Sequence, residues 1–471
     1  MTISPSYQPP HRLPTRCPAS NISTLIVGAG VGGLMAGLEC WRKGHSVRII
    51  ERSPVRLTSG DGVTIGHSAI RALDHWPDMA EENERIGYDF MYSWHKITGE
   101  KLTEKARFQL NAGKTQGPGI EPAEQPPKVY RHSRPKFHLM LCRQLEKLGL
   151  EIEYGKRVME YFEDPELQKA GVVVEDGERI EADVVLAADG IGSKSARVTI
   201  AMADPVVRER FHVLPGGIPS AEIWIGAGVN AVFTVSQDEF SWVLIHPDAE
   251  DSSESWSQLV DPSKALETMA TIPGWPEIAD RVIGLTPKDK LYDFKLIWRE
   301  PQPDWVSSGG LIVQIGDAAH PMLPTSGNGA TQAMEDAISL AACLQVAGKE
   351  NVQWATRVHN KLRFERVTCL QKLGIINHQS RHRSNNPSPS QARIIGLTAA
   401  WIWEHDPERY AVEKYSAALA YLREGSAFQN TNIPRGYVYR PWTIDGLLSA
   451  KEEGQVLEMD WEEGPVSNSR L

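Results

Sequence analysis

The chain has 471 residues, of which 41% are hydrophobic and 23% charged, and its formal net charge is −10. This length predicts a large core with a second domain inserted or appended, and the acidic balance argues against a nucleic-acid-binding protein, which needs a basic face for phosphates. Five scattered cysteines without a CxxC spacing argue against a disulfide framework or a metal site and favour a reducing, cytoplasmic location. The longest apolar stretch near the C-terminal end, 394–403, is much shorter than the roughly 20 residues that span a bilayer, so stable membrane insertion is not expected.

The chain begins with a proline-rich segment and then a regular pattern. Residues 1–22 predict a disordered tail, because their prolines prevent the amphipathic helix that a targeting peptide needs. A short apolar run at 24–27 predicts a strand, the pattern over 32–42 predicts a helix, and the apolar run at 46–51 predicts a second strand. A strand, a glycine-rich turn, a helix and a strand in this order form a βαβ unit.

The middle of the chain changes from mixed elements to strands. The next predicted elements are a helix, a strand and a hairpin around an Asp-Gly turn, at 135–148, 151–154, 171–175 and 181–188. The segment 201–299 alternates apolar and polar residues and predicts an antiparallel sheet in a second domain. A strand at 310–315 and a long helix over 328–347 follow. The remainder is predicted to be helical, with a loop near 381–391.

A glycine-rich motif lies between the first strand and the first helix. Its glycines are Gly28, Gly30, Gly32 and Gly33. In such a motif one glycine permits the tight turn, one lets the backbone approach a pyrophosphate, and one lets helix and strand pack closely. Glu51, at the end of the second strand, is suited to accept hydrogen bonds from a ribose diol. The pattern predicts dinucleotide binding but does not distinguish NAD from FAD.

Two later strand ends make that distinction. One apolar strand ends in Asp189-Gly190, and another ends in Gly316-Asp317. The three motifs in this order resemble the FAD-dependent aromatic hydroxylases of the salicylate and para-hydroxybenzoate hydroxylase type, and most of all their fungal biosynthetic branch. The resemblance is strong in the motifs over 23–345 and thin over 201–299.

The resemblance implies an α/β fold with three parts. A Rossmann-like FAD-binding domain is expected from residues 23–75, 128–200 and 300–370. A substrate domain built on an antiparallel sheet is expected from residues 76–127 and 201–299. A helical C-terminal region is expected over 371–471. Four aromatic residues of the second domain either line its pocket or belong to its core: Trp224, Phe233, Phe240 and Trp242.

The resemblance also implies residues for the cofactor site. Asp317 is expected to accept a hydrogen bond from the ribityl chain of FAD. Backbone N–H groups at the following helix start are expected to reach the flavin N1–C2=O edge, where negative charge accumulates on reduction. That helix start comprises Pro324, Gly327, Asn328, Gly329 and Ala330. Other expected cofactor contacts are Arg52, Gly62, Val63, Arg134, Asp189 and Gly190.

This sequence departs from the family at three places. Asn328 stands where the family usually has Gln, Phe137 replaces a Leu in the motif that Arg134 opens, and Asp61 replaces a small residue beside Gly62. The first departure has little effect if the contact comes from the backbone. The resemblance further suggests Arg197 as a catalytic residue that faces the substrate, with an ion pair at a helix start as the alternative.

The reaction implied by the resemblance is aromatic hydroxylation or epoxidation. NADPH or NADH docks transiently and reduces FAD, the reduced flavin and O2 form a C4a-hydroperoxide, and an electron-rich phenol, indole or polyketide attacks it. The protein is expected to act as a monomer or homodimer in secondary metabolism.

Two other functions share the cofactor motifs. A flavin-dependent halogenase ordinarily carries a Trp-x-Trp-x-Ile-Pro stretch, but Trp401-Ile402-Trp403 is followed by Glu404. A non-enzymatic binding protein of the same fold would have no use for a glycine-rich helix start after the Gly316-Asp317 segment. Both alternatives are therefore less favoured than the monooxygenase.

Overall fold

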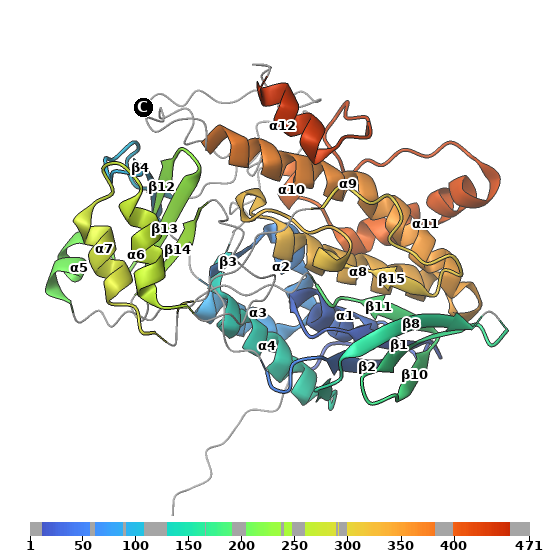
Figure 1. The fold of residues 1–471 in the computed structure, drawn as a ribbon. Coiled ribbons are helices and arrows are strands. Elements are labelled where there is room, and N and C mark those ends of the chain that lie inside the picture. Colours follow the sequence, from blue (N-terminus) through green and yellow to red (C-terminus); the bar gives the residue numbers. More distant parts are fainter. Residues whose placement is uncertain are drawn as a thin grey trace, which may run out of the picture.

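The computed structural model describes residues 12–56, 62–87, 91–107, 130–164, 166–190, 204–236, 240–246, 260–288, 291, 299–381 and 399–452. Figure 1 shows two β-containing bodies. The larger one carries strands β1, β2 and β11 with helices α1, α4 and α8, and the smaller one carries β4, β12, β13 and β14 with α5, α6 and α7. Helices α9 to α12 lie on the larger body.

The larger body is built on a five-stranded parallel sheet in the order β15-β11-β1-β2-β7. Its strands are β1 (Ser23–Val27), β2 (Ser46–Glu51), β7 (Ile152–Tyr154), β11 (Val184–Ala187) and β15 (Ile312–Gln314). The central strands β1 and β11 are almost wholly buried, as a sheet covered on both faces requires. The covering helices are α1 (Val31–Arg42), α4 (Arg134–Lys147) and α8 (Gly329–Ala347).

A three-stranded sheet continues from this body. It contains β8 (Val158–Asp164), β9 (Lys169–Val174) and β10 (Arg179–Ala182), all antiparallel. The hairpin around the Asp-Gly turn forms as predicted, but its second strand does not continue to residue 188. It ends at Ala182, and Val184 begins β11 in the parallel sheet. The reason is burial: β10 alternates exposed and buried residues, whereas β11 is buried throughout.

Short elements connect the two bodies. Strands β3 (Gly62–Ile65) and β6 (Tyr130–Ser133) pair antiparallel, and α2 (His67–Ile70) and α3 (Pro77–Ile86) lie between β3 and β4 in the chain. Met79 of α3 belongs to the core of the larger body, together with Trp76. The expected domain boundaries remain predictions, although this core places α3 with the parallel sheet and not with the second domain.

The smaller body is a five-stranded sheet in the order β14-β13-β12-β4-β5. Strands β12 (Ser220–Gly226), β13 (Val229–Val235) and β14 (Phe240–Ile245) are antiparallel, as predicted. Strand β4 (Met91–Lys96) pairs in parallel with β12 and antiparallel with β5 (Ala106–Arg107). Helices α5 (Pro205–Arg210), α6 (Pro262–Ala270) and α7 (Glu277–Gly284) bury one core, which includes Trp224, Phe233, Phe240 and Trp242.

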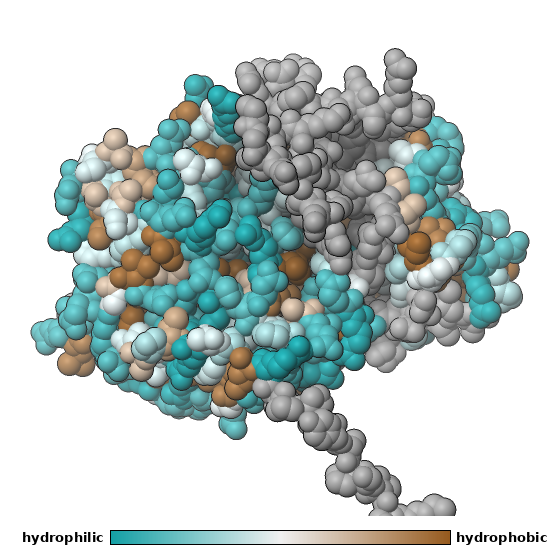
Figure 2. Space-filling view, turned by 180° about the vertical axis from the view of Figure 1, so that it is seen from behind, coloured by the Kyte–Doolittle hydropathy of each residue, from teal (hydrophilic) through white to brown (hydrophobic). Residues whose placement is uncertain are grey.

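The C-terminal region is helical. It contains α9 (Val352–Arg381), α10 (Ala400–Trp403), α11 (Pro407–Glu424) and α12 (Ile444–Glu452). Within the described ranges, no helix combines the length and the apolar character that crossing a membrane requires. Figure 2 shows one face of the molecule, on which hydrophobic residues form small groups among hydrophilic ones. The predicted fold class is confirmed.

Candidate functional site

The turn between β1 and α1 is shaped by close backbone approaches. Gly28 has a φ of +106°, and a Cβ there would lie 2.4 Å from the carbonyl oxygen of Ala188. A Cβ on Gly33 would lie 2.0 Å from the carbonyl oxygen of Gly28. A Cβ on Gly30, in contrast, would meet no protein atom within 4 Å. The first two glycines are therefore required by the protein itself, and Gly30 faces open space at the start of a helix, where anions bind.

Glu51 is held against this turn. Its carboxylate accepts hydrogen bonds from the backbone N–H groups of Ala29 and Ser53, both at 2.8 Å. On the other side, His138 of α4 lies with its Nε2 2.8 Å from the carbonyl oxygen of Ala29. The turn is thus fixed from both sides. His138 is the last residue of the motif that Arg134 opens, but the sequence alone assigns it no role. Arg52, the next residue after Glu51, is exposed.

The Gly316-Asp317 turn meets the first motif at one small residue of α8. A Cβ on Gly316, whose φ is +60°, would lie 3.0 Å from the Cβ of Ala333, and a Cβ on Gly32 would lie 3.1 Å from the same atom. Helix α8 therefore packs directly on both turns through Ala333. Together with the approach of Gly28 to Ala188, this brings the three motifs to one place.

The Asp189-Gly190 segment follows β11 in the same region. Asp189 is exposed and accepts a hydrogen bond from the hydroxyl group of Tyr161, at 2.9 Å. Burial, and then the nearby Asp189 carboxylate, raise the pKa of Tyr161. The phenol therefore stays protonated and acts as a donor. Gly190 has a φ of +64°, in the left-handed region that favours glycine.

Asp317 and Arg134 face the same space. The side chain of Asp317 is exposed, yet the surrounding protein desolvates it and raises its pKa, while His320 and Arg134 act in the opposite direction. Burial likewise lowers the pKa of Arg134, and Asp317 opposes that change. Asp317 and Arg134 therefore lie close enough for the charge of each to act on the other.

The predicted flavin-edge segment forms a tight turn before α8. Residues Pro324–Ser326 form a short 3₁₀ helix, Gly327 has a φ of +60°, and Asn328 caps α8. The side-chain amide of Asn328 donates to the carbonyl of Ser326 at 2.8 Å, so the side chain stabilises the turn and leaves the helix start to Gly329 and Ala330. Pro324 is exposed.

Gly62 and Val63 lie beside the start of α4. In the β3–β6 pair, Gly62 is opposite Ser133 and Val63 is opposite His132. Ser133 immediately precedes Arg134, the first residue of α4. Two segments that the sequence separates by about seventy residues are thus neighbours, and their contact with one cofactor stays a prediction.

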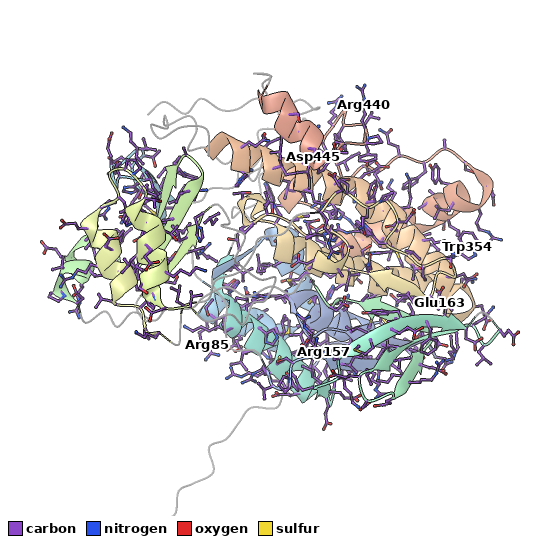
Figure 3. The ribbon with its side chains drawn as sticks, viewed as in Figure 1. Arg85, Arg157, Glu163, Trp354, Arg440 and Asp445 are labelled. Carbon is purple, nitrogen blue, oxygen red and sulfur yellow. The ribbon has the colours of Figure 1, made fainter. Side chains whose placement is uncertain are left out.

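Glu163, labelled in Figure 3, orders the turn that leads into β15. Its carboxylate accepts hydrogen bonds from the hydroxyl of Ser307 at 2.5 Å and from the backbone N–H groups of Gly309 and Leu311 at 2.9 and 2.7 Å. Glu163 therefore orders the residues before β15, and the packing of Gly316 on Ala333 orders the residues after it.

These groups fit a dinucleotide with a polar chain. The open space at Gly30 suits a pyrophosphate, Glu51 offers a carboxylate at the end of β2, and Asp317 offers a second carboxylate just after β15. The expected catalytic residue Arg197 and the departing residue Asp61 lie outside the described residues.

A family described as FAD binding domain matches residues 21–354 of this chain. The chain belongs to this family. It is 40% identical to the FAD-dependent monooxygenase fsr3 of Gibberella fujikuroi, over 96% of this chain and 91% of that protein. It is 36% identical to the FAD-dependent monooxygenase mdpD of Emericella nidulans, over 96% and 93%. The protein is an FAD-dependent monooxygenase of the type found in fungal secondary metabolism, and the predicted cofactor FAD is confirmed.

Solved structures agree with this assignment. The crystal structure of FqzB matches with a TM-score of 0.75 and 29% identity, over 91% of this chain and all of that one. The structure of CtdE in complex with FAD and its substrate 4 matches with a TM-score of 0.75 and 26% identity, over 86% of this chain and all of that one. A salicylate hydroxylase substrate complex has the same fold, with a TM-score of 0.58 at 19% identity.

Proposed function

We propose that this monooxygenase uses NADPH or NADH and O2 to hydroxylate or epoxidise an electron-rich aromatic small molecule, namely a phenol, an indole or a polyketide. When bound, FAD supplies the redox and oxygen chemistry. The observation that carries the proposal is that the three motifs meet: Gly32 and Gly316 approach Ala333 of α8, and Gly28 approaches Ala188, next to Asp189. This brings the Asp317 carboxylate and the start of α8 to one place.

The protein's own groups have distinct tasks in this proposal. Gly30 and the first turn of α1 bind the pyrophosphate, and Glu51 and Asp317 bind hydroxyl groups of the cofactor. The N-terminus of α8, at Gly329, directs free N–H groups and a partial positive charge at the flavin edge. That charge stabilises the anionic form on which the reaction with O2 depends.

The second sheet supports an aromatic substrate. Its face opposite α5, α6 and α7 carries a row of apolar side chains, which the strand register aligns across the sheet: Trp94, Ile223, Val232 and Val243. A neighbouring row has three hydroxyl groups: Tyr92, Thr234 and Ser241. Trp94 and Thr234 are buried, so we place a flat ring with phenolic oxygens on the partly exposed side chains of β12 to β14. Such a ring buries apolar area there and pairs its oxygens with polar groups. In Figure 1 this face is turned toward the larger body.

A substrate panel tests the proposal. The purified protein is supplied with FAD and NADPH or NADH, and phenols, indoles and polyketides are compared for stimulated NAD(P)H oxidation and for a product heavier by one oxygen atom. We expect at least one class to give both signals. If none does, while a halide-dependent product forms, the protein is a halogenase.

We also propose that Arg197 contacts the substrate or an oxidised intermediate. Arg197→Ala is expected to retain FAD and NAD(P)H oxidation but to lose coupled product. The control is Arg85→Ala, since Arg85 is an exposed residue on α3 (Figure 3). Normal product formation by Arg197→Ala would show that Arg197 has only a structural role.

Finally, we propose a cytoplasmic monomer or homodimer. Light scattering of the FAD-loaded protein measures its mass, and a tetramer or larger assembly would contradict this proposal.

A further inference from the structure

Helices α8 and α9 share a buried cluster of charged side chains. Its acids, Glu335 and Asp336, are adjacent on α8, and its cations, Arg363 and Arg366, lie on α9. All four side chains are at most 1% exposed. Burying four charges is costly unless each is paired and hydrogen-bonded, and here each is. The two acids, however, make their remaining hydrogen bonds in different directions.

Asp336 connects the cluster to the Gly316-Asp317 turn. One carboxylate oxygen accepts from Nε of Arg363 at 2.7 Å. The other accepts from the backbone N–H of Gly316 at 3.0 Å and lies 2.5 Å from Nε2 of His320. The same carboxylate therefore holds the first residue of the turn and the histidine that ends it, with Asp317 between them.

In the described part of the chain, Glu335 makes no hydrogen bond to that turn. It accepts hydrogen bonds from Arg363 and Arg366, from the hydroxyl group of Ser68 on α2 and from the side-chain amide of Gln332 on α8. It is as deeply buried as Asp336 and shares Arg363 with it. A substitution at Glu335 therefore serves as a matched control: it disturbs the charged cluster, as a substitution at Asp336 does, but not the Gly316-Asp317 turn.

We propose that Asp336 is a positioning residue for FAD: through Gly316 and His320 it fixes the turn that presents Asp317 to the cofactor. Helix α8 begins at Gly329, so Asp336 also sets the distance between the helix start at the flavin edge and the carboxylate at the ribityl chain. Preorganisation of two contact groups by one rigid element raises affinity, because their ordering is not required at binding.

Asp336→Asn tests this role. The side chain keeps its size, but its amide nitrogen must face either the Gly316 N–H or the Arg363 guanidinium, and both are donors. One of these ties is therefore lost. We expect FAD to bind at least about tenfold more weakly, and the visible circular dichroism of saturated, bound flavin to change. Binding is measured by titrating the apoprotein with FAD in the absence of substrate, so the result does not depend on the proposed substrate class.

Glu335→Gln is the control. We expect it to lower the thermal unfolding midpoint as much as Asp336→Asn does, while FAD affinity and the flavin spectrum stay as in the natural protein. Equal losses of FAD affinity in the two variants, or an unchanged affinity in Asp336→Asn, would overturn the proposal.

A second pair decides the question if Asp336→Asn does not fold. His320→Gln loosens the end of the turn, whereas His359→Gln changes an equally buried histidine of α9 that contacts Ser339. We expect only His320→Gln to weaken FAD binding and to alter the spectrum of the bound flavin. The opposite ranking would contradict the proposal.

Discussion

Gly30 and Gly33 lie three residues apart in one turn, yet they face different surroundings. A Cβ on Gly33 would collide with the carbonyl of Gly28, whereas Gly30 faces open space. A substitution at Gly33 therefore tests the packing of the protein, and a substitution at Gly30 tests the space that the pyrophosphate needs.

We expect Gly30→Ala to leave the unfolding midpoint of the apoprotein unchanged but to weaken FAD binding by about tenfold or more, since the added methyl group meets only the cofactor. Gly33→Ala should lower the midpoint as well. Differential scanning fluorimetry and FAD titration measure the two effects. Normal FAD binding by Gly30→Ala would show that the pyrophosphate does not lie at Gly30.

Asp317 shows a conflict between stability and binding. Its pKa is raised by desolvation, so its charge disfavours the folded apoprotein at neutral pH, and this loss grows as pH rises through the carboxyl's folded-state pKa. We expect Asp317→Asn to raise the unfolding midpoint of the apoprotein and to weaken FAD binding. Asp304→Asn, at an exposed position, should do neither. A lower midpoint for Asp317→Asn would mean that the attraction of the carboxylate to His320 and Arg134 outweighs its desolvation.

The motif residues could be predicted at this scale because glycines and a strand-end acid at this spacing are seldom needed outside a nucleotide site. Ala333, His138 and Asp336 could not. They are ordinary residues of helices, and their roles arise only when α8 and α4 pack against the turns. Spacing within one segment contains no information about such contacts between segments.

At the scale of elements, α9 packs against the predicted flavin-edge turn, residues 324–328. The hydroxyl of Thr325 donates to the carbonyl of Gly374 at 2.8 Å, and a Cβ on Gly374 would lie 2.9 Å from the Cβ of Ser326. Helix α12 adds Ile444 and Leu447 to an apolar cluster with Leu323, the residue before the turn. The turn therefore rests on two C-terminal helices.

We expect Gly374→Ala to displace this turn and to weaken FAD binding several-fold, with a lower unfolding midpoint, even though alanine favours helices. Gly284→Ala, at the end of α7, is the control, because a Cβ there meets no atom within 4 Å. FAD titration of both variants measures the difference. Normal binding by Gly374→Ala would show that the turn tolerates movement.

Most elements could be predicted from periodicity, and the exceptions have physical causes. The run 181–188 predicts one strand because apolar residues dominate it, but its two halves join different sheets. The parallel pairing of β4 with β12 joins residues more than a hundred positions apart, and no local pattern encodes it. The four aromatic residues left open between core and pocket belong to the core under α5, α6 and α7.

At the scale of the whole molecule, buried histidines set the response to acid. Burial lowers the pKa of His45 and of His132 to about 4 and that of His359 to about 3, from an ordinary value of 6.5. Between pH 6.5 and about 4, these histidines are therefore protonated in the unfolded chain but stay neutral in the folded chain. Stability is retained above pH 6.5 and is lost as pH falls through this window.

We expect thermal unfolding midpoints of the apoprotein to fall steeply across that window. His132 contributes up to about 3 kcal/mol of this loss, since its pKa differs from the ordinary value by about 2.5. Its ring packs against Phe137, with centroids 4.7 Å apart, so His132→Phe should fold and flatten the pH dependence. An equally steep curve for His132→Phe would assign the acid sensitivity to other groups.

The order of strands and charges has a consequence for synthesis. The middle strands β1, β2 and β11 are complete by residue 187, but the edge strand β15 joins the parallel sheet only after residue 314 has been made. A nascent chain that stops before α9 has made Glu335 and Asp336 but neither of their arginines, and unpaired carboxylates resist burial. The larger body is therefore completed late, whereas the strands and helices described for the smaller body all lie between residues 91 and 284. The larger body stays incomplete until α9 has been made, and chaperone supply should therefore affect the yield of this enzyme in a recombinant host.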